Sequence, residues 1–147
     1  MEPLLELPEL PQNAKLLDYL RSQASPPSGP DDYTLGPWQL HTHPDLISQL
    51  RALAPGHPLT AAYGIPILAA GGIAAVVAHG TDWLIIRLHH LPPGVHTEDH
   101  PAWTLAQDGD WHIISPDQDQ LTGPEYARTI CQLVTDALTH AASLATP

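Results

Sequence analysis

Histidine supplies most of the side chains in this chain that could bind a metal or move a proton. The sequence holds ten histidines, and His96 and His100 stand four residues apart with Glu98 and Asp99 between them. On a turn of helix, two imidazoles at this spacing reach one ion, as in zinc sites. Prolines on both sides, including Pro101, oppose a regular helix. Two interpretations stay open: a metal site at His96 and His100, or a solvated loop without metal or cofactor, which we favour.

Arg87 is the second residue of interest, because it interrupts an otherwise apolar run, 83–88. A guanidinium in a buried strand needs a partner or a path to water. An ion pair with an acid such as Asp82 or Asp45 meets that need, and so does a side chain that extends to the sheet margin. The functional alternative is that Arg87 contacts an anion or a partner protein at the end of the sheet.

Other reactive residues point to structure rather than to catalysis. The acids of segment 108–119 fall in turns, where aspartate hydrogen-bonds its own backbone. The sequence has no G-x-S-x-G motif, and no lysine follows Gly71-Gly72 as it would in a phosphate-binding loop. Cys131 is the only cysteine, so no internal disulfide forms, and a packing role is expected. The four tryptophans are expected to pack in the core or at an interface.

The charge balance excludes several partners. Sixteen acids face five bases among 147 residues, which gives a net charge of −11. Nucleic acids and anionic membrane surfaces are bound through clustered Lys and Arg, and no such cluster is present. The segment 1–12 lacks the basic start of a secretory signal, and the apolar run 65–78 is too short and too broken to span a bilayer. We therefore expect a cytoplasmic protein that binds neither nucleic acid nor membrane.

The pattern of the first 40 residues predicts a helical arm. Apolar residues recur at helical spacing over 13–24, and a segment rich in Pro, Ser and Gly follows at 25–32. This composition is typical of a linker without helix or strand. We therefore divide the chain into an arm and linker, residues 1–40, and a core domain, residues 41–147.

The core domain is predicted to contain an antiparallel meander. Pro44 begins a helix that Pro55-Gly56 ends. Short apolar segments separated by glycine turns follow, and tight turns join antiparallel strands. The expected strands are 59–63, 65–70, 73–79, 82–89, 103–107 and 111–115, the last two flanking Asp108-Gly109-Asp110.

The last helix has the clearest signature. Thr122 and Glu125 form a capping box with Pro124 between them. The residues that follow place an apolar stripe, which includes Leu133 and Leu138, on one side. A helix with one apolar face lies on a sheet, so we predict an α+β fold with two layers, in which helices cover one face of the antiparallel sheet.

Four segments of this core carry a family resemblance. Residues 45–55 (DLISQLRALAP) lead to Tyr63-Gly-Ile65, and residues 71–77 (GGIAAVV) lead to residues 84–88 (LIIRL). This order resembles the N-terminal domain of the TfoX competence-regulator family, over about residues 45–145. The resemblance implies the fold just described and carries over no active site.

These observations favour a non-enzymatic interaction or regulatory domain. A homodimer is expected, because the apolar segments 65–78 and 83–88 exceed what one helical layer covers, and an apolar arm helix is left over. The alternative is a metal-binding protein or metal-dependent enzyme that uses the loop at His96 and His100.

Overall fold

A computed structural model describes residues 5–23, 34–35, 38–39, 42, 44–54, 56–57, 59–79, 83–88, 111–114 and 123–145. The elements are, in chain order, β1 (Leu5–Glu6), the short 3-10 helix η1 (Pro11–Asn13), α1 (Ala14–Gln23), β2 (Thr34–Leu35), β3 (Trp38–Gln39), α2 (Pro44–Leu53), β4 (Leu59–Ala62), β5 (Ile65–Ala70), β6 (Ile73–His79), β7 (Trp83–Arg87), β8 (Trp111–Ile114) and α4 (Gly123–Ala145).

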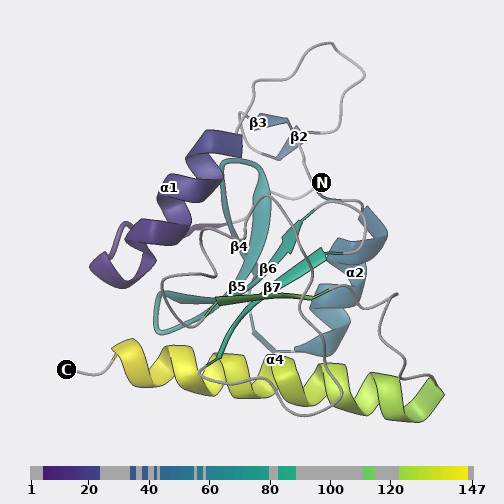
Figure 1. The fold of residues 1–147 in the computed structure, drawn as a ribbon. Coiled ribbons are helices and arrows are strands. Elements are labelled where there is room, and N and C mark those ends of the chain that lie inside the picture. The colour runs from purple at the N-terminus through teal and green to yellow at the C-terminus, as the bar shows by residue number, and fades with distance from the viewer. Residues whose placement is uncertain are drawn as a thin grey trace.

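The main sheet follows the order β1-β4-β5-β6-β7-β8 (Figure 1). Each strand from β4 to β8 pairs antiparallel with the next, which confirms the predicted meander. The short β1 adds a parallel edge, with Leu5 opposite Thr60. β2 and β3 form a separate antiparallel pair. The strand expected at 103–107 and its turn lie outside the described residues.

Two tight turns set the register of the meander, because their residues adopt left-handed backbone angles. Gly71 and Gly72, between β5 and β6, have φ of +61° and +82°. Tyr63 and Gly64, between β4 and β5, have φ of +54° and +81°. Positive φ at both central residues matches the twist of paired strands, so the predicted glycine turns are confirmed. Tyr63 is unusual there, since only glycine adopts this conformation freely.

α2 and α4 pack on one face of the sheet, as the helical periodicity predicted. α4 lies across the sheet along one side of the molecule (Figure 1). α4 buries Leu133 and Leu138 of its apolar stripe, and α2 buries Leu46, Ile47 and Leu50. Every second side chain of a strand points to this face, as Leu84 and Ile86 do on β7. The predicted α+β class is thereby confirmed.

α1 packs on the opposite face, which the sequence pattern did not place. Leu16, Leu17 and Leu20 are buried in a second cluster with the other side chains of the central strands, such as Ile67 and Ile85. Strand β7, expected to be buried on both faces, is indeed covered on both. The sheet is therefore covered by helices on both faces: α2 and α4 pack on one face, and α1 packs on the other.

Residues 5–23 consequently belong to the packed core, although from sequence we expected an arm at 1–40. The physical reason is the second apolar face of the sheet, which the stripe of α1 removes from water. The predicted linker, 25–32, lies outside the described residues. Within the described part of the chain, no helix is both long enough and apolar enough to cross a membrane.

Candidate functional site

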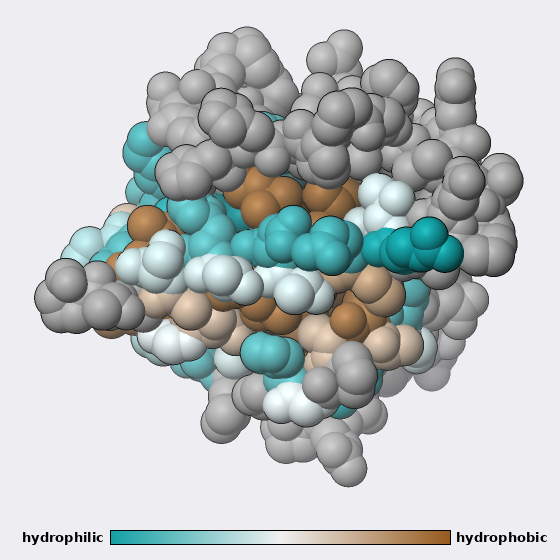
Figure 2. Space-filling view, turned by 90° about the horizontal axis from the view of Figure 1, so that it is seen from below, coloured by the Kyte–Doolittle hydropathy of each residue, from teal (hydrophilic) through white to brown (hydrophobic). Residues whose placement is uncertain are grey.

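An open apolar pocket lies where the end of α2, the end of β5 and the middle of α4 meet. Its volume is about 400 Å³, which is within the range of binding pockets. It is lined by Leu53, Ala54, His57, Ala70, Thr135, Leu138, Thr139 and Ala142. Seen from the side of α4, apolar surface borders the helix (Figure 2). The lining contains no Asp, Glu, Lys or Arg, so it suits an apolar group.

The local sequence explains why the surface is hollow at this point. After α2 ends, Gly56 turns the chain with φ of +91°, and the His57 N–H donates to the Ala54 carbonyl at 3.1 Å. This turn sets the exposed His57 at the rim of the pocket. Ala70 and Ala142 contribute only methyl groups where longer side chains would fill the space.

The solvent face of α4 borders the pocket and carries few charges. Arg128, Gln132 and Asp136 are exposed and follow one another at intervals of four residues. Gln132 Nε2 donates to Asp136 Oδ1 at 2.7 Å, and Thr139 Oγ1 donates to the Thr135 carbonyl at 3.0 Å. Both bonds stay within the helix. Among residues 128–144, whose side chains the structure describes, this face carries the charged Arg128 and Asp136 beside the neutral Gln132, Thr135 and Thr139.

Arg87, the candidate contact residue, lies inside the protein, opposite Trp111 on the neighbouring strand. Only 9% of its surface is exposed, and its guanidinium lies over the Trp111 ring, 5.0 Å from the ring centre. This cation–π contact gives the charge a partner that the sequence did not reveal. Of the acids proposed from sequence, Asp82 and the side chain of Asp45 lie outside what the structure describes. A role of Arg87 in binding an anion or a partner stays a prediction.

The histidine candidates fall in two groups. His96 and His100 lie outside the described residues, so a metal site there stays a prediction, which elemental analysis of tag-free protein would test. His112, on β8, lies with Nε2 2.9 Å from the Leu88 carbonyl oxygen. Because a carbonyl only accepts, that nitrogen donates the proton. Among the described residues, no three His, Cys, Asp or Glu side chains gather closely enough to hold a metal ion.

Asn13 is a structural residue that the sequence did not single out. Its side chain is fully buried, and its Nδ2 donates to the carbonyls of Pro8 and Gly72, each at 2.9 Å. Its Oδ1 accepts the Ala74 N–H at 2.9 Å. Asn13 therefore pairs with the β5–β6 turn as a strand would, and ties the start of α1 to the sheet. Its only sequence signal is its place just before an amphipathic stripe.

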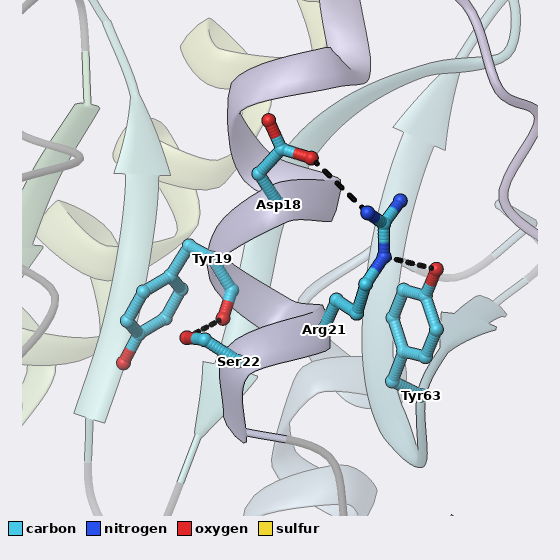
Figure 3. Close-up of polar contacts among 5 residues, drawn as sticks. All are labelled: Asp18, Tyr19, Arg21, Ser22 and Tyr63. Atoms are coloured by element: carbon cyan, nitrogen blue, oxygen red, sulfur yellow. Dashed lines mark hydrogen bonds and ion pairs between the residues drawn. The ribbon is translucent and has the colours of Figure 1, made fainter.

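A polar contact joins α1 to the β4–β5 turn (Figure 3). The Arg21 Nε–H donates to the Tyr63 hydroxyl at 3.2 Å, and Arg21 Nη1 lies 3.7 Å from Asp18 Oδ1. The bond to Tyr63, followed by the nearby charges, raises the pKa of Arg21 above its ordinary value. The contact is exposed, so it holds the strained Tyr63 turn against α1 without adding much stability.

The second tyrosine in this view, Tyr19, points away from the Arg21 contact (Figure 3). Burial raises the pKa of its hydroxyl above 10.0. A neutral phenol in a partly buried site is a packing group, and it stays protonated at neutral pH. The Tyr19 hydroxyl therefore supplies no phenolate base at neutral pH.

Comparison with known proteins leaves the chain without a match: no protein-family model, no curated protein and no solved structure is significantly similar to it. The resemblance to the TfoX family therefore stays a prediction. Among the described residues, this pocket and the solvent face of α4 are the features that we consider for recognition.

Proposed function

We propose that this chain is a cytoplasmic, non-enzymatic interaction domain that associates with a second copy of itself through α4 and the adjacent pocket. The observation that carries the proposal is the uncharged apolar pocket beside the solvent face of α4. Anchoring side chains at protein interfaces fill pockets in the partner surface and are desolvated there on binding.

The chemistry of the pocket favours recognition over catalysis. General acid–base or nucleophilic catalysis needs two or more groups within hydrogen-bond reach. The described lining contains one imidazole, that of His57, and Thr139 already donates its hydroxyl proton to a backbone carbonyl. An apolar side chain that enters this space displaces water and leaves no buried charge unpaired.

The charge of the chain is compatible with self-association through this face. A net charge of −11 opposes contact between two copies. The described part of the solvent face of α4 carries Arg128 and Asp136, and thus no net charge. By contrast, the apolar excess that predicted a dimer from sequence is covered by α1 within one chain. The proposal therefore rests on the pocket and on α4.

The size of the contact sets the expected affinity. One helix face with its bordering pocket lies near the lower end of specific interface areas, about 1,000 Å² in total. Such contacts form transient dimers, so we expect association in the micromolar range. Moderate salt screens charges beyond about 10 Å, which permits the contact despite the net charge.

The test is light scattering on the full chain over a range of concentrations. We expect the mean mass to rise from that of one chain, 15.9 kDa, towards that of a dimer. The variant Ala142→Trp, which fills the pocket, should stay monomeric. Ser48→Trp, on the exposed surface of α2 and outside the pocket lining, is the matched control and should associate normally. A wild-type mass that stays constant, or a dimer that Ala142→Trp leaves intact, would contradict the proposal.

A further inference from the structure

We infer that two copies of the chain pair through antiparallel α4 helices, so that Arg128 of each copy lies opposite Asp136 of the other. The inference rests on the proposed function and specifies its interface. It follows from the placement of opposite charges on one exposed helix face.

The two charges are well placed for such a contact. Arg128 and Asp136 are exposed and belong to the same helix, with Gln132 midway between them. Residues spaced by four follow one face, and eight residues cover about 12 Å along the axis. Figure 2 shows the hydrophilic side chains as a row along α4, with apolar surface at its flank. A partner helix laid along this row meets both charges.

Two-fold symmetry makes the arrangement self-complementary. In an antiparallel pair of helices centred on Gln132, each residue faces the one equally distant on the other side of the centre. Arg128 then faces the second copy's position 136, and the same contact recurs with the roles exchanged. In a parallel pair, Arg128 of one copy would instead face Arg128 of the other, and Asp136 would face Asp136. Opposite charges therefore select the antiparallel orientation.

The neighbouring residues permit close approach of the helices. Thr135, Thr139 and Ala142 are small and exposed, and they line the pocket. Close approach of α4 helices brings the pocket of each copy against the surface of the other. The ion pairs flank the centre of this contact, where opposite charges fix the orientation and like charges strongly oppose pairing.

The test uses charge reversal on the full chain. Arg128→Glu creates two like-charge contacts in its homodimer, and Asp136→Arg does the same with positive charges. We expect each variant alone to dimerise at least tenfold more weakly than the wild type in sedimentation experiments. In an equimolar mixture, both contacts become attractive again, so a heterodimer with near wild-type affinity should form.

Matched controls remove the effect of net charge. Arg51→Glu and Asp18→Arg change the net charge of the chain by the same amounts, at exposed positions on α2 and α1. They should shift the dissociation constant less than twofold at moderate salt. Circular dichroism spectra should show that all four variants keep their helix content.

The outcomes separate this inference from the function on which it rests. A monomeric wild type would contradict both. A wild-type dimer whose affinity responds to Arg128→Glu and Asp136→Arg no more than to the controls would overturn the antiparallel register alone. A mixture of the two variants that stays monomeric would overturn it as well.

Discussion

The guanidinium of Arg87 stacks on the indole of Trp111, 5.0 Å from the centre of the ring, across directly opposed positions of β7 and β8. The pair lies on the same face of the sheet as α1, since Trp111 belongs to that core cluster. The Trp111 ring thus partners the positive charge of Arg87 in a strand whose other side chains are apolar.

We expect this pair to show energetic coupling. Cation–π contacts contribute about 0.5–1 kcal/mol when exposed and about 2 kcal/mol when desolvated. A double-mutant cycle with Arg87→Met and Trp111→Leu, measured by urea unfolding, should give a coupling free energy of about 1 kcal/mol. Strict additivity of the two single changes would show that the contact contributes nothing.

Asn13 should be among the most sensitive polar positions. Asn13→Ala leaves the Gly72 carbonyl and the Ala74 N–H without the side chain that pairs them. Each buried group left unsatisfied costs about 1–3 kcal/mol, so we expect a loss of about 3 kcal/mol in the free energy of unfolding.

Gln12→Ala is the control for Asn13, because Gln12 is exposed and makes one long bond to the Leu144 carbonyl, at 3.2 Å. Its effect should stay within about 0.5 kcal/mol. Equal effects of the two substitutions would contradict the clamping role of Asn13.

α1 should be required for folding, contrary to the arm predicted from sequence. Leu20→Ala empties a fully buried site against the sheet and should cost about 2–5 kcal/mol, as should Leu133→Ala in α4. Deletion of residues 1–40 should give a chain that binds a hydrophobic dye and lacks a cooperative unfolding transition. A truncated chain with wild-type stability would show that the second face of the sheet needs no cover.

Tyr19 should make the protein less stable at alkaline pH. Its folded-state pKa is raised by burial, so the unfolded chain releases this proton first. The stability that the neutral phenol contributes is fully present below about pH 10 and is lost as the pH rises through the folded-state pKa. Tyr19→Phe should flatten the decline of the unfolding free energy above that pH. An unchanged slope would contradict a buried titrating hydroxyl.

Much of the fold could be predicted from the sequence, because its signals are local. The stripe of α4 and the paired glycines of the β5–β6 turn each specify their own structure within a few residues. The meander follows from the short turns between apolar segments.

The remaining features depend on contacts that are distant in sequence. An amphipathic stripe such as that of α1 shows that a face is buried, but not which surface covers it. The pairing of Arg87 with Trp111 depends on the register of β7 against β8, two strands that are distant in sequence. The pocket could not be predicted either, because it is a space left where side chains of α2, β5 and α4 do not meet, and these elements are distant in sequence. The histidine pair considered from sequence as a metal site, His96 and His100, lies outside the described residues.

Cys131 allows the most direct test of the α4 interface. It is the only cysteine in the chain, and it is exposed on α4 beside Gln132. In the antiparallel pair, the two copies of Cys131 are offset by about 3 Å along axes that lie about 8–10 Å apart. A short bismaleimide should therefore link two full chains into a covalent dimer at micromolar concentration, and Arg128→Glu should suppress the product. If only singly modified monomers formed over the same concentration range, α4 would not be the surface through which this protein associates.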